Sequence, residues 1–336
     1  MRALTLLLAL AAALRLTAAI PQVVTANTIL DDLVRQVGGN QVTTYCLVAP
    51  GADPHAFEPR PSDVRHLVAA DLLVVNGLNL EPAILKLAQN SGFKGEIVVA
   101  TTGLTPRTGG CAHDHNHAEA HSPLGTPSSS SASETGHEPP PACTHDHTPG
   151  ASPVSGLPSP VSSADPHAWQ NPLLVATYVA NLRDALARAN PAAAELYRTR
   201  AAAYTAQLVA LDRWVREEIA TIPPARRRLV TTHDSLGYFA DAYGFETIPV
   251  AGISSSAEPD ARALAAIVDE IRHEQVPAVF FELTTNPKLL RQIGTDAGVR
   301  LAEPLFTDSL GAPGSGAETY LDLIRTNTTR IVSALR

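Results

Sequence analysis

With 336 residues, the chain has room for about two domains at ~150 residues each. Its 45% hydrophobic and 17% charged residues exclude wholesale disorder, and a formal charge of −8 excludes a basic nucleic-acid-binding surface. Three cysteines are too few for a disulfide-stabilised scaffold. Because aromatic residues make up only 5%, the predicted cores are mainly aliphatic.

The N-terminus has the pattern of a secretory signal peptide. Arg2 precedes an apolar run over residues 3–14, and small residues follow at Thr17 and Ala19. The run is shorter than the ~20 residues that a membrane span requires, so an uncleaved anchor is disfavoured. We expect cleavage after Ala19. Since no cysteine lies near that position, we expect a protein without a lipid anchor.

Residues 20–190 are expected to form a first α/β lobe. Short apolar segments alternate with segments of helical spacing, such as Ile29, Leu33 and Val37. Ser62 is the expected N-cap of the second helix. Strands are predicted over residues 22–25, 42–48, 72–75 and 96–100, and helices over residues 29–37, 62–70, 173–189 and from residue 82 onward. This alternation predicts a parallel sheet flanked by helices.

A low-complexity insertion interrupts this lobe over residues 106–164. Serine and proline dominate it and apolar periodicity is lost, which predicts a disordered segment. Cys111 and Cys143 bracket most of its histidines; they could form a disulfide in an oxidising compartment or bind metal beside those histidines. Seven of the twelve histidines of the chain lie here and are candidates for weaker metal sites: His113, His115, His117, His121, His137, His145 and His147.

Order is expected to resume at Asp165, and a long helix follows. Pro191 suits the first helical position, and the helix could then extend over residues 192–222. About 30 residues at 1.5 Å each give roughly 45 Å, so residues 191–222 are predicted to connect two lobes stiffly. Residues 223–336 repeat the first pattern. Strands are predicted there over 228–232, 247–250, 278–282 and 299–302, and helices over 236–243, 259–273, 287–297 and 320–335.

Three of the five histidines outside the insertion follow a pattern. The tripeptide Asp-Pro-His ends at His55 and again at His167, both in predicted loops, and His233 directly follows a predicted strand. Ligands of open α/β sheets bind beyond the carboxyl ends of strands. Asp308, in a loop of the second lobe, is a fourth candidate. Three imidazoles and one carboxylate suit a borderline divalent cation, with zinc first.

The remaining two histidines, His66 and His273, lie within predicted helices among charged neighbours. We expect both to be solvent-exposed and to take no part in a metal site. Cys46 lies within a predicted strand and is expected to be buried and unreactive.

Four segments carry a resemblance to a known family. They read PGADPHAFEPRPSDV, ADPHAWQNP, TTHDSLGYFADAYG and FTDSLG, in this order. They resemble the metal-binding periplasmic receptor (substrate-binding protein) family of zinc and manganese ABC importers, of the ZnuA/TroA type. The resemblance implies two α/β lobes, each with a roughly four-stranded parallel sheet, joined by one long rigid helix, with the metal in the cleft between them. Carried over residue by residue, it implies the ligands His55, His167, His233 and Asp308.

The resemblance also favours one metal. In the manganese branch a glutamate takes the position of His233, so this chain resembles the zinc branch, as does its His-rich insertion. It implies a periplasmic, monomeric receptor that delivers Zn²⁺ to the ABC permease of a zinc importer. Four protein ligands leave no open position for an activated water, so no enzymatic activity is expected.

Three alternatives remain at this point. The first is a manganese- or iron-binding receptor of the same family. The second is a secreted zinc hydrolase, although no His-Glu-x-x-His motif is present. The third is a His-rich metal buffer that works without a transporter.

Neighbouring residues have expected supporting roles. Glu282, at the end of a predicted strand, could contact a ligand histidine, although a surface carboxylate explains it equally well. Asp53 and Asp165 are expected to cap their loops. Trp169 and Phe57 are expected to line the cleft.

Overall fold

A computed structural model describes residues 20–108, 164–251, 261–283 and 288–336. The predicted signal peptide lies outside the described residues. So do the seven histidines of the insertion and the pair Cys111 and Cys143, so those predictions stay open.

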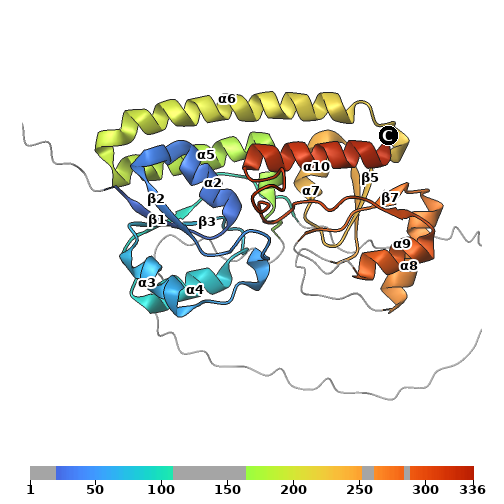
Figure 1. Cartoon of the computed structure of the whole chain (residues 1–336), viewed down its shortest axis with the longest axis horizontal. Coiled ribbons are helices and arrows are strands. Elements are labelled where there is room, and N and C mark those ends of the chain that lie inside the picture. Colours follow the sequence, from blue (N-terminus) through green and yellow to red (C-terminus); the bar gives the residue numbers. More distant parts are fainter. Residues whose placement is uncertain (1–19, 109–163, 252–260, 284–287) are drawn as a thin grey trace, which may run out of the picture. The chain divides into compact units, whose positions relative to one another are not determined.

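The first lobe is built on a four-stranded parallel sheet with the strand order β2-β1-β3-β4. The strands are β1 (Gln22–Thr25), β2 (Thr43–Cys46), β3 (Leu72–Val75) and β4 (Glu96–Val99). Helices α3 (Pro61–Ala69) and α4 (Pro82–Ser91) cover one face, and α2 (Thr28–Gly38) and α5 (Pro172–Ala189) lie on the other (Figure 1). All four residues of β3 are buried, as its continuous apolar sequence predicts.

Helix α3 begins one residue earlier than expected, at Pro61. The carboxylate of Asp63 accepts a hydrogen bond from the backbone N–H of Arg60 at 2.7 Å. The prediction of Ser62 as N-cap is therefore wrong. Proline suits the first helical position because it has no N–H to satisfy, and an acidic residue two positions later reaches back to the preceding N–H.

The second lobe repeats the topology of the first. Its parallel sheet has the order β6-β5-β7-β8. In both lobes, therefore, the second strand along the chain is an edge strand that pairs with the first. The strands are β5 (Arg228–Thr231), β6 (Glu246–Pro249), β7 (Ala278–Val279) and β8 (Arg300–Leu301). The last two are shorter than expected, but a parallel bridge between Glu282 and Leu305 continues the pairing beyond them. The helices are α7 (Gly237–Tyr243), α8 (Ala261–His273), α9 (Lys288–Ala297) and α10 (Tyr320–Leu335).

One long helix, α6 (Ala194–Ile219), joins the two lobes. Its 26 residues span about 39 Å at 1.5 Å per residue. It begins later than expected because a separate 3-10 turn over Pro191–Ala193 precedes it. Figure 1 shows α6 running along both lobes, with α5 beside its first half and α10 beside its second.

The main hydrophobic core is shared between the lobes. Leu33 and Leu73 of the first lobe, Leu208 of α6 and Leu229 and Tyr320 of the second lobe belong to one continuous cluster of buried residues. A smaller cluster, which includes Val230, Ile271 and Ile293, lies under α8 and α9. The lobes are therefore joined by packing as well as by the long helix.

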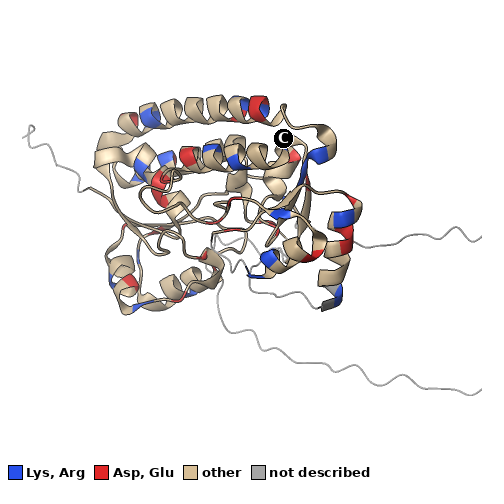
Figure 2. Ribbon diagram, turned by 45° about the vertical axis from the view of Figure 1, so that its right-hand side comes forward, with Lys and Arg blue, Asp and Glu red and all other residues tan. Residues whose placement is uncertain are grey.

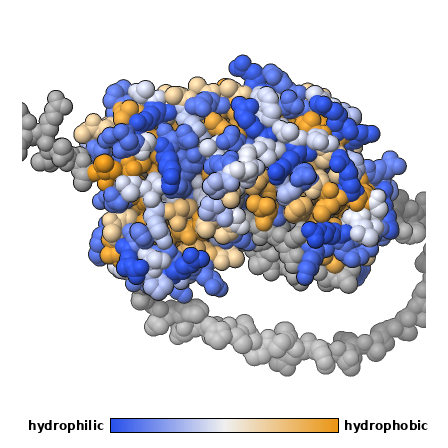
Figure 3. Space-filling model, viewed as in Figure 1, coloured by the Kyte–Doolittle hydropathy of each residue, from blue (hydrophilic) through white to orange (hydrophobic). Residues whose placement is uncertain are grey.

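The surface of the described residues carries mixed charges. Basic and acidic residues are scattered along the helices (Figure 2), and hydrophilic and hydrophobic residues are mixed over the face seen in Figure 3. Among the described helices, none combines the length and the apolar composition that crossing a membrane would take.

Candidate metal centre

The structure brings the four predicted side chains together between the lobes. His55, His167, His233 and Asp308 each offer one ligand atom, and these four atoms lie within 4.8 Å of one another. The Nε2 atoms of His55 and His167 are 3.2 Å apart. The carboxylate of Asp308 lies 3.5 Å from Nε2 of His167 and 3.3 Å from Nε2 of His233. In the described part of the chain, no other group of histidine, cysteine and acidic residues converges in this way.

The two Asp-Pro-His tripeptides share one local geometry. His55 lies in a 3-10 turn over Pro54–Ala56, where its backbone N–H donates to the carboxylate of Asp53 at 2.8 Å. The backbone N–H of His167 donates to Asp165 in the same way at 2.9 Å. In both copies the aspartate therefore caps the turn that presents the histidine, as the sequence predicted.

Asp165 has a second contact that the sequence analysis missed. Its Oδ1 atom lies 2.8 Å from Nδ1 of His167, and neither side chain has any solvent exposure. A hydrogen bond at Nδ1 fixes the orientation of the imidazole and leaves Nε2 to face the site. The repeated tripeptide was the available signal, but it indicated only a capping role.

The Glu282 carboxylate orients His233 through the ring nitrogen Nδ1 and the backbone N–H. His233 follows β5 and Glu282 follows the neighbouring β7, and the Glu282 carboxylate bonds to Nδ1 of His233 and to its backbone N–H at 3.3 Å. Ser235 donates its hydroxyl to the same carboxylate at 3.2 Å. Because Glu282 has no solvent exposure, the alternative of a surface carboxylate is wrong.

The segment that carries Asp308 is held by both lobes. The Thr307 hydroxyl donates to the Asp308 carboxylate at 3.3 Å. The next residue, Ser309, makes contacts of 3.2 Å with the hydroxyl of Thr28 and 2.8 Å with the backbone N–H of Gly51, both in the first lobe. These contacts place a ligand candidate of the second lobe against the loop that presents His55.

The electrostatics of the four groups differ with their partners. Burial opposes charge on His55 and lowers its pKa to about 4. Burial acts in the same direction on His233, but the carboxylates of Glu282 and Asp308 outweigh it and raise its pKa to about 10. Burial favours protonation of Asp308, yet the three imidazoles lower its pKa. The site is thus built to hold a negative charge on Asp308.

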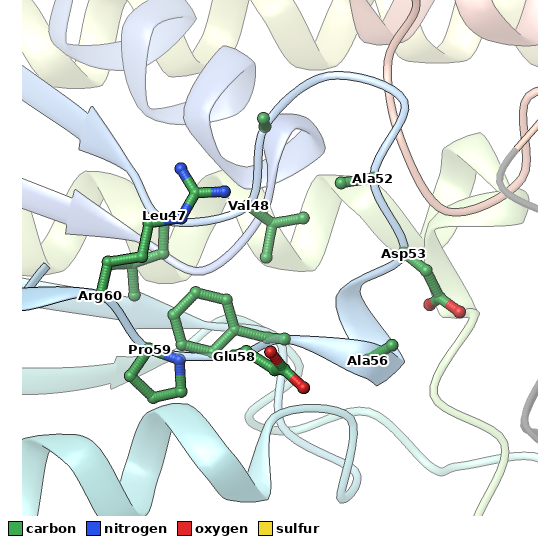
Figure 4. Close-up of a pocket in the computed structure, with 10 residues that line it drawn as sticks. Leu47, Val48, Ala52, Asp53, Ala56, Glu58, Pro59 and Arg60 are labelled. Carbon is green, nitrogen blue, oxygen red and sulfur yellow. The ribbon is translucent and has the colours of Figure 1, made fainter.

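His55 is the only one of the four that is partly exposed. The loop that carries it also borders a cavity of about 300 Å³ (Figure 4). Asp53 and Phe57 line this cavity, whereas Trp169 is buried with its ring centre 5.2 Å from that of His167. Trp169 therefore packs directly against the site, and Phe57 lies on the neighbouring cavity.

The other residues singled out in the sequence lie apart from the centre. His66 is exposed and stacks on Tyr45, with ring centres 3.7 Å apart. His273 is exposed and lies 3.0 Å from Glu274. Cys46 is only half-buried by surface exposure, and desolvation raises its thiol pKa to about 12. A thiol with so high a pKa forms little of the reactive thiolate, but the prediction that Cys46 is buried is not fully met.

The sequence model of the family described as "Zinc-uptake complex component A periplasmic" (ZnuA) matches residues 23–334. This chain belongs to that family. It is a metal-binding, substrate-binding receptor of ABC-type metal importers and not an enzyme. The predicted family, the two-lobe α/β fold with its long helix and the absence of catalysis are confirmed.

Similar proteins bear the names of different metals. The manganese-binding lipoprotein MntA of Halalkalibacterium halodurans is 30% identical over 94% of this chain and 88% of its own length. The iron-binding protein YfeA of Yersinia pestis is 29% identical, over 90% of this chain and 82% of its own. The solved structure of the periplasmic zinc-binding protein TroA from Treponema pallidum is 26% identical in sequence, with a TM-score of 0.74. The match covers 94% of this chain and 99% of the TroA chain.

Proposed function

We propose that this chain captures Zn²⁺ at His55, His167, His233 and Asp308 and delivers it to the permease of an ABC-type zinc importer. One observation carries the proposal. Nε2 of His233 and Oδ1 of Asp308 are buried and form no hydrogen bond among the described residues; their partners within the site are other members of the same cluster, at 3.3 and 3.5 Å. Buried polar atoms are nearly always hydrogen-bonded, so two such atoms in a cluster whose four ligand atoms lie within 4.8 Å of one another suit a bound cation.

The donor set supports zinc within this class. Zn²⁺ accepts imidazole nitrogen and carboxylate oxygen in a tetrahedron, whereas Mn²⁺ favours more oxygen donors. Three imidazoles and a single carboxylate match the first preference. Asp165 and Glu282 hold Nδ1 of His167 and His233, which makes each Nε2 a more basic ligand.

Manganese or iron is the competing cargo, because MntA and YfeA are named for these metals. The test uses the full chain, freed of metal with a chelator and equilibrated without oxygen. Free Zn²⁺ is buffered at a hundredth of the free Mn²⁺ or Fe²⁺ concentration, and the bound metal is then measured. We expect zinc to occupy the first equivalent. Preferential retention of manganese or iron would contradict the zinc proposal.

Site assignment needs matched variants. His167→Ala and His233→Ala should lose this first equivalent, and His66→Ala and His273→Ala should retain it. Zinc import is tested in zinc-limited cells that lack the gene. The parent should restore cellular zinc, and His233→Ala should not.

A further inference from the structure

Arg107 connects acidic residues of both lobes. Its guanidinium lies 3.2 Å from Asp165, 3.7 Å from Asp234 and 3.1 Å from Asp241. Asp165 belongs to the His167 loop, Asp234 directly follows His233, and Asp241 lies on α7. The Arg107 guanidinium therefore contacts two carboxylates, Asp165 and Asp234, that lie close in sequence to predicted metal ligands.

Hydrogen bonds also hold the backbone around Arg107 in place. Its carbonyl accepts the N–H of Asp165 at 2.8 Å, and Thr108 forms an antiparallel bridge with Ala164. The hydroxyl of Tyr238 accepts the N–H of Arg107 at 2.8 Å and donates to the carbonyl of Asp165 at 2.9 Å. A residue of α7 in the second lobe thus joins both segments of the first.

Gly237 leaves room for the guanidinium. A Cβ atom at this position would lie 2.2 Å from Nη1 of Arg107, so the guanidinium would have to shift to make room for it. Glycine at the start of α7 therefore permits the close approach of Arg107, which is only 22% exposed.

The two oxygens of the buried Asp165 carboxylate have different partners. Oδ1 receives the N–H of His167 and lies against Nδ1 of its ring, while Oδ2 contacts Arg107. Without the guanidinium, this buried charge would lose its cationic partner and the carboxylate could rotate. The orientation of the His167 ring depends on that carboxylate.

We propose that Arg107 is a positioning residue of the metal centre: through the Asp165 carboxylate it orients the His167 ring, and through Asp234 it holds the backbone next to His233 in the other lobe. This inference rests on the proposed zinc site. Loss of the carboxylate that orients a ligand histidine typically lowers metal affinity by about 10- to 100-fold, and Arg107 acts through such a carboxylate.

The test uses the metal-free full chain and its first equivalent of metal. Zn²⁺ affinity is measured by competition with a chromophoric chelator, and ligand geometry by the visible spectrum of bound Co²⁺. We expect Arg107→Met to bind Zn²⁺ about 10- to 100-fold more weakly and to alter the Co²⁺ spectrum. Arg107→Lys, which keeps the charge, should recover part of the affinity. Gly237→Ala, which keeps the arginine but displaces it, should resemble Arg107→Met.

Arg188→Met is the control, because Arg188 forms an exposed ion pair with Glu96 between α5 and β4. It should match the parent in both measurements. Parent-like affinity and Co²⁺ spectra in Arg107→Met and Gly237→Ala would overturn the inference. A lower melting temperature with an unchanged Co²⁺ spectrum would also overturn it, since the role would then be purely structural. If Arg107→Met does not fold, Arg107→Lys and Gly237→Ala decide the outcome.

Failure of the proposed function would look different. In that case the parent itself would bind no Zn²⁺, or His233→Ala would bind it as tightly as the parent. Both proposals would then be overturned together.

Discussion

Trp169 donates its indole N–H to the backbone carbonyl of Thr307 at 2.7 Å, from one lobe to the other. Trp169 lies two residues after His167, and Thr307 directly precedes Asp308. The side chain of Gln170 donates to the same carbonyl, also at 2.7 Å. The chain segments of two predicted ligands are therefore tied together beside the metal centre, in addition to the connection through α6.

Removing this bond should loosen the centre. Trp169→Phe keeps an aromatic ring but deletes the donor, while Gln170 still satisfies the carbonyl. We expect the free energy of unfolding to fall by about 1–2 kcal/mol and Zn²⁺ affinity to decrease. Urea unfolding and chelator competition measure the two effects. Trp214→Phe, on α6, should keep parental Zn²⁺ affinity; an equal loss of affinity in both variants would contradict the assignment.

The three histidines should not contribute equally. Each of four bonds accounts for roughly 3 kcal/mol if zinc binding is worth about 10–16 kcal/mol, so His167→Ala and His233→Ala should lose more than 100-fold in affinity. His55 is partly exposed, so water can replace its imidazole and His55→Ala should lose less. Zinc titration of the three variants, beside His66→Ala, tests this ranking. Parent-like binding by His167→Ala would remove that residue from the site.

Replacement of Asp308 should be as costly as replacement of a buried histidine. Glu282 is bonded to His233 and Ser235 and cannot swing into the vacated position. Asp308→Asn, which preserves volume but removes the charge, should therefore lose about 100-fold or more in Zn²⁺ affinity, about 3 kcal/mol. Competition titration measures the loss. Near-parental affinity in Asp308→Asn would show that the carboxylate is not a ligand.

Glu81 should make the stability of the first lobe depend on pH. Its buried carboxylate accepts backbone N–H groups of Asn76 at 2.7 Å and Gly77 at 3.1 Å. Burial raises its pKa to about 7 from an ordinary 4.5, despite these bonds. Because the folded pKa is raised, the stabilising contribution is complete below about pH 4.5 and is lost as the pH rises through about 7.

Between about pH 4.5 and 7, the contribution of Glu81 to the free energy of unfolding should change by on the order of 3 kcal/mol. In Glu81→Gln this dependence should disappear, so the difference in unfolding free energy between parent and variant should vary from pH 4.5 to 8. Urea unfolding of the metal-free proteins measures it. The exposed Glu217→Gln should follow the parent at every pH, and parallel profiles for Glu81→Gln and the parent would refute the assignment.

Zinc binding should cause little movement of the lobes. Helix α10 packs against both α6 and α2, and its Tyr320 donates its hydroxyl to the backbone carbonyl of Trp169 at 2.7 Å. Such contacts resist a hinge opening. We expect metal-free and zinc-bound forms to have similar radii of gyration in solution scattering. A large compaction on adding zinc would show that these contacts break.

The sequence by itself determined the elements and the ligand candidates. Apolar runs and prolines predicted the strands and most helix starts, because these are local preferences of the backbone. The positions of His55 and His233 after predicted strands pointed to one edge of each sheet, since parallel strands end together, and the repeated Asp-Pro-His added His167. Local sequence also explains the error at Ser62, because Pro61 and Asp63 together favour a helix start at Pro61.

The tertiary structure decided how the candidates are held. Trp169 and Thr307 are 138 residues apart in sequence, and Arg107 meets Asp165 and Asp234 only after both lobes have packed on α6. The burial of Glu282 likewise depends on its neighbours. Hydrogen bonds between loops have no periodicity, because they depend on where distant segments meet. Sequence patterns therefore predict which side chains can bind metal, whereas packing determines which atoms orient them.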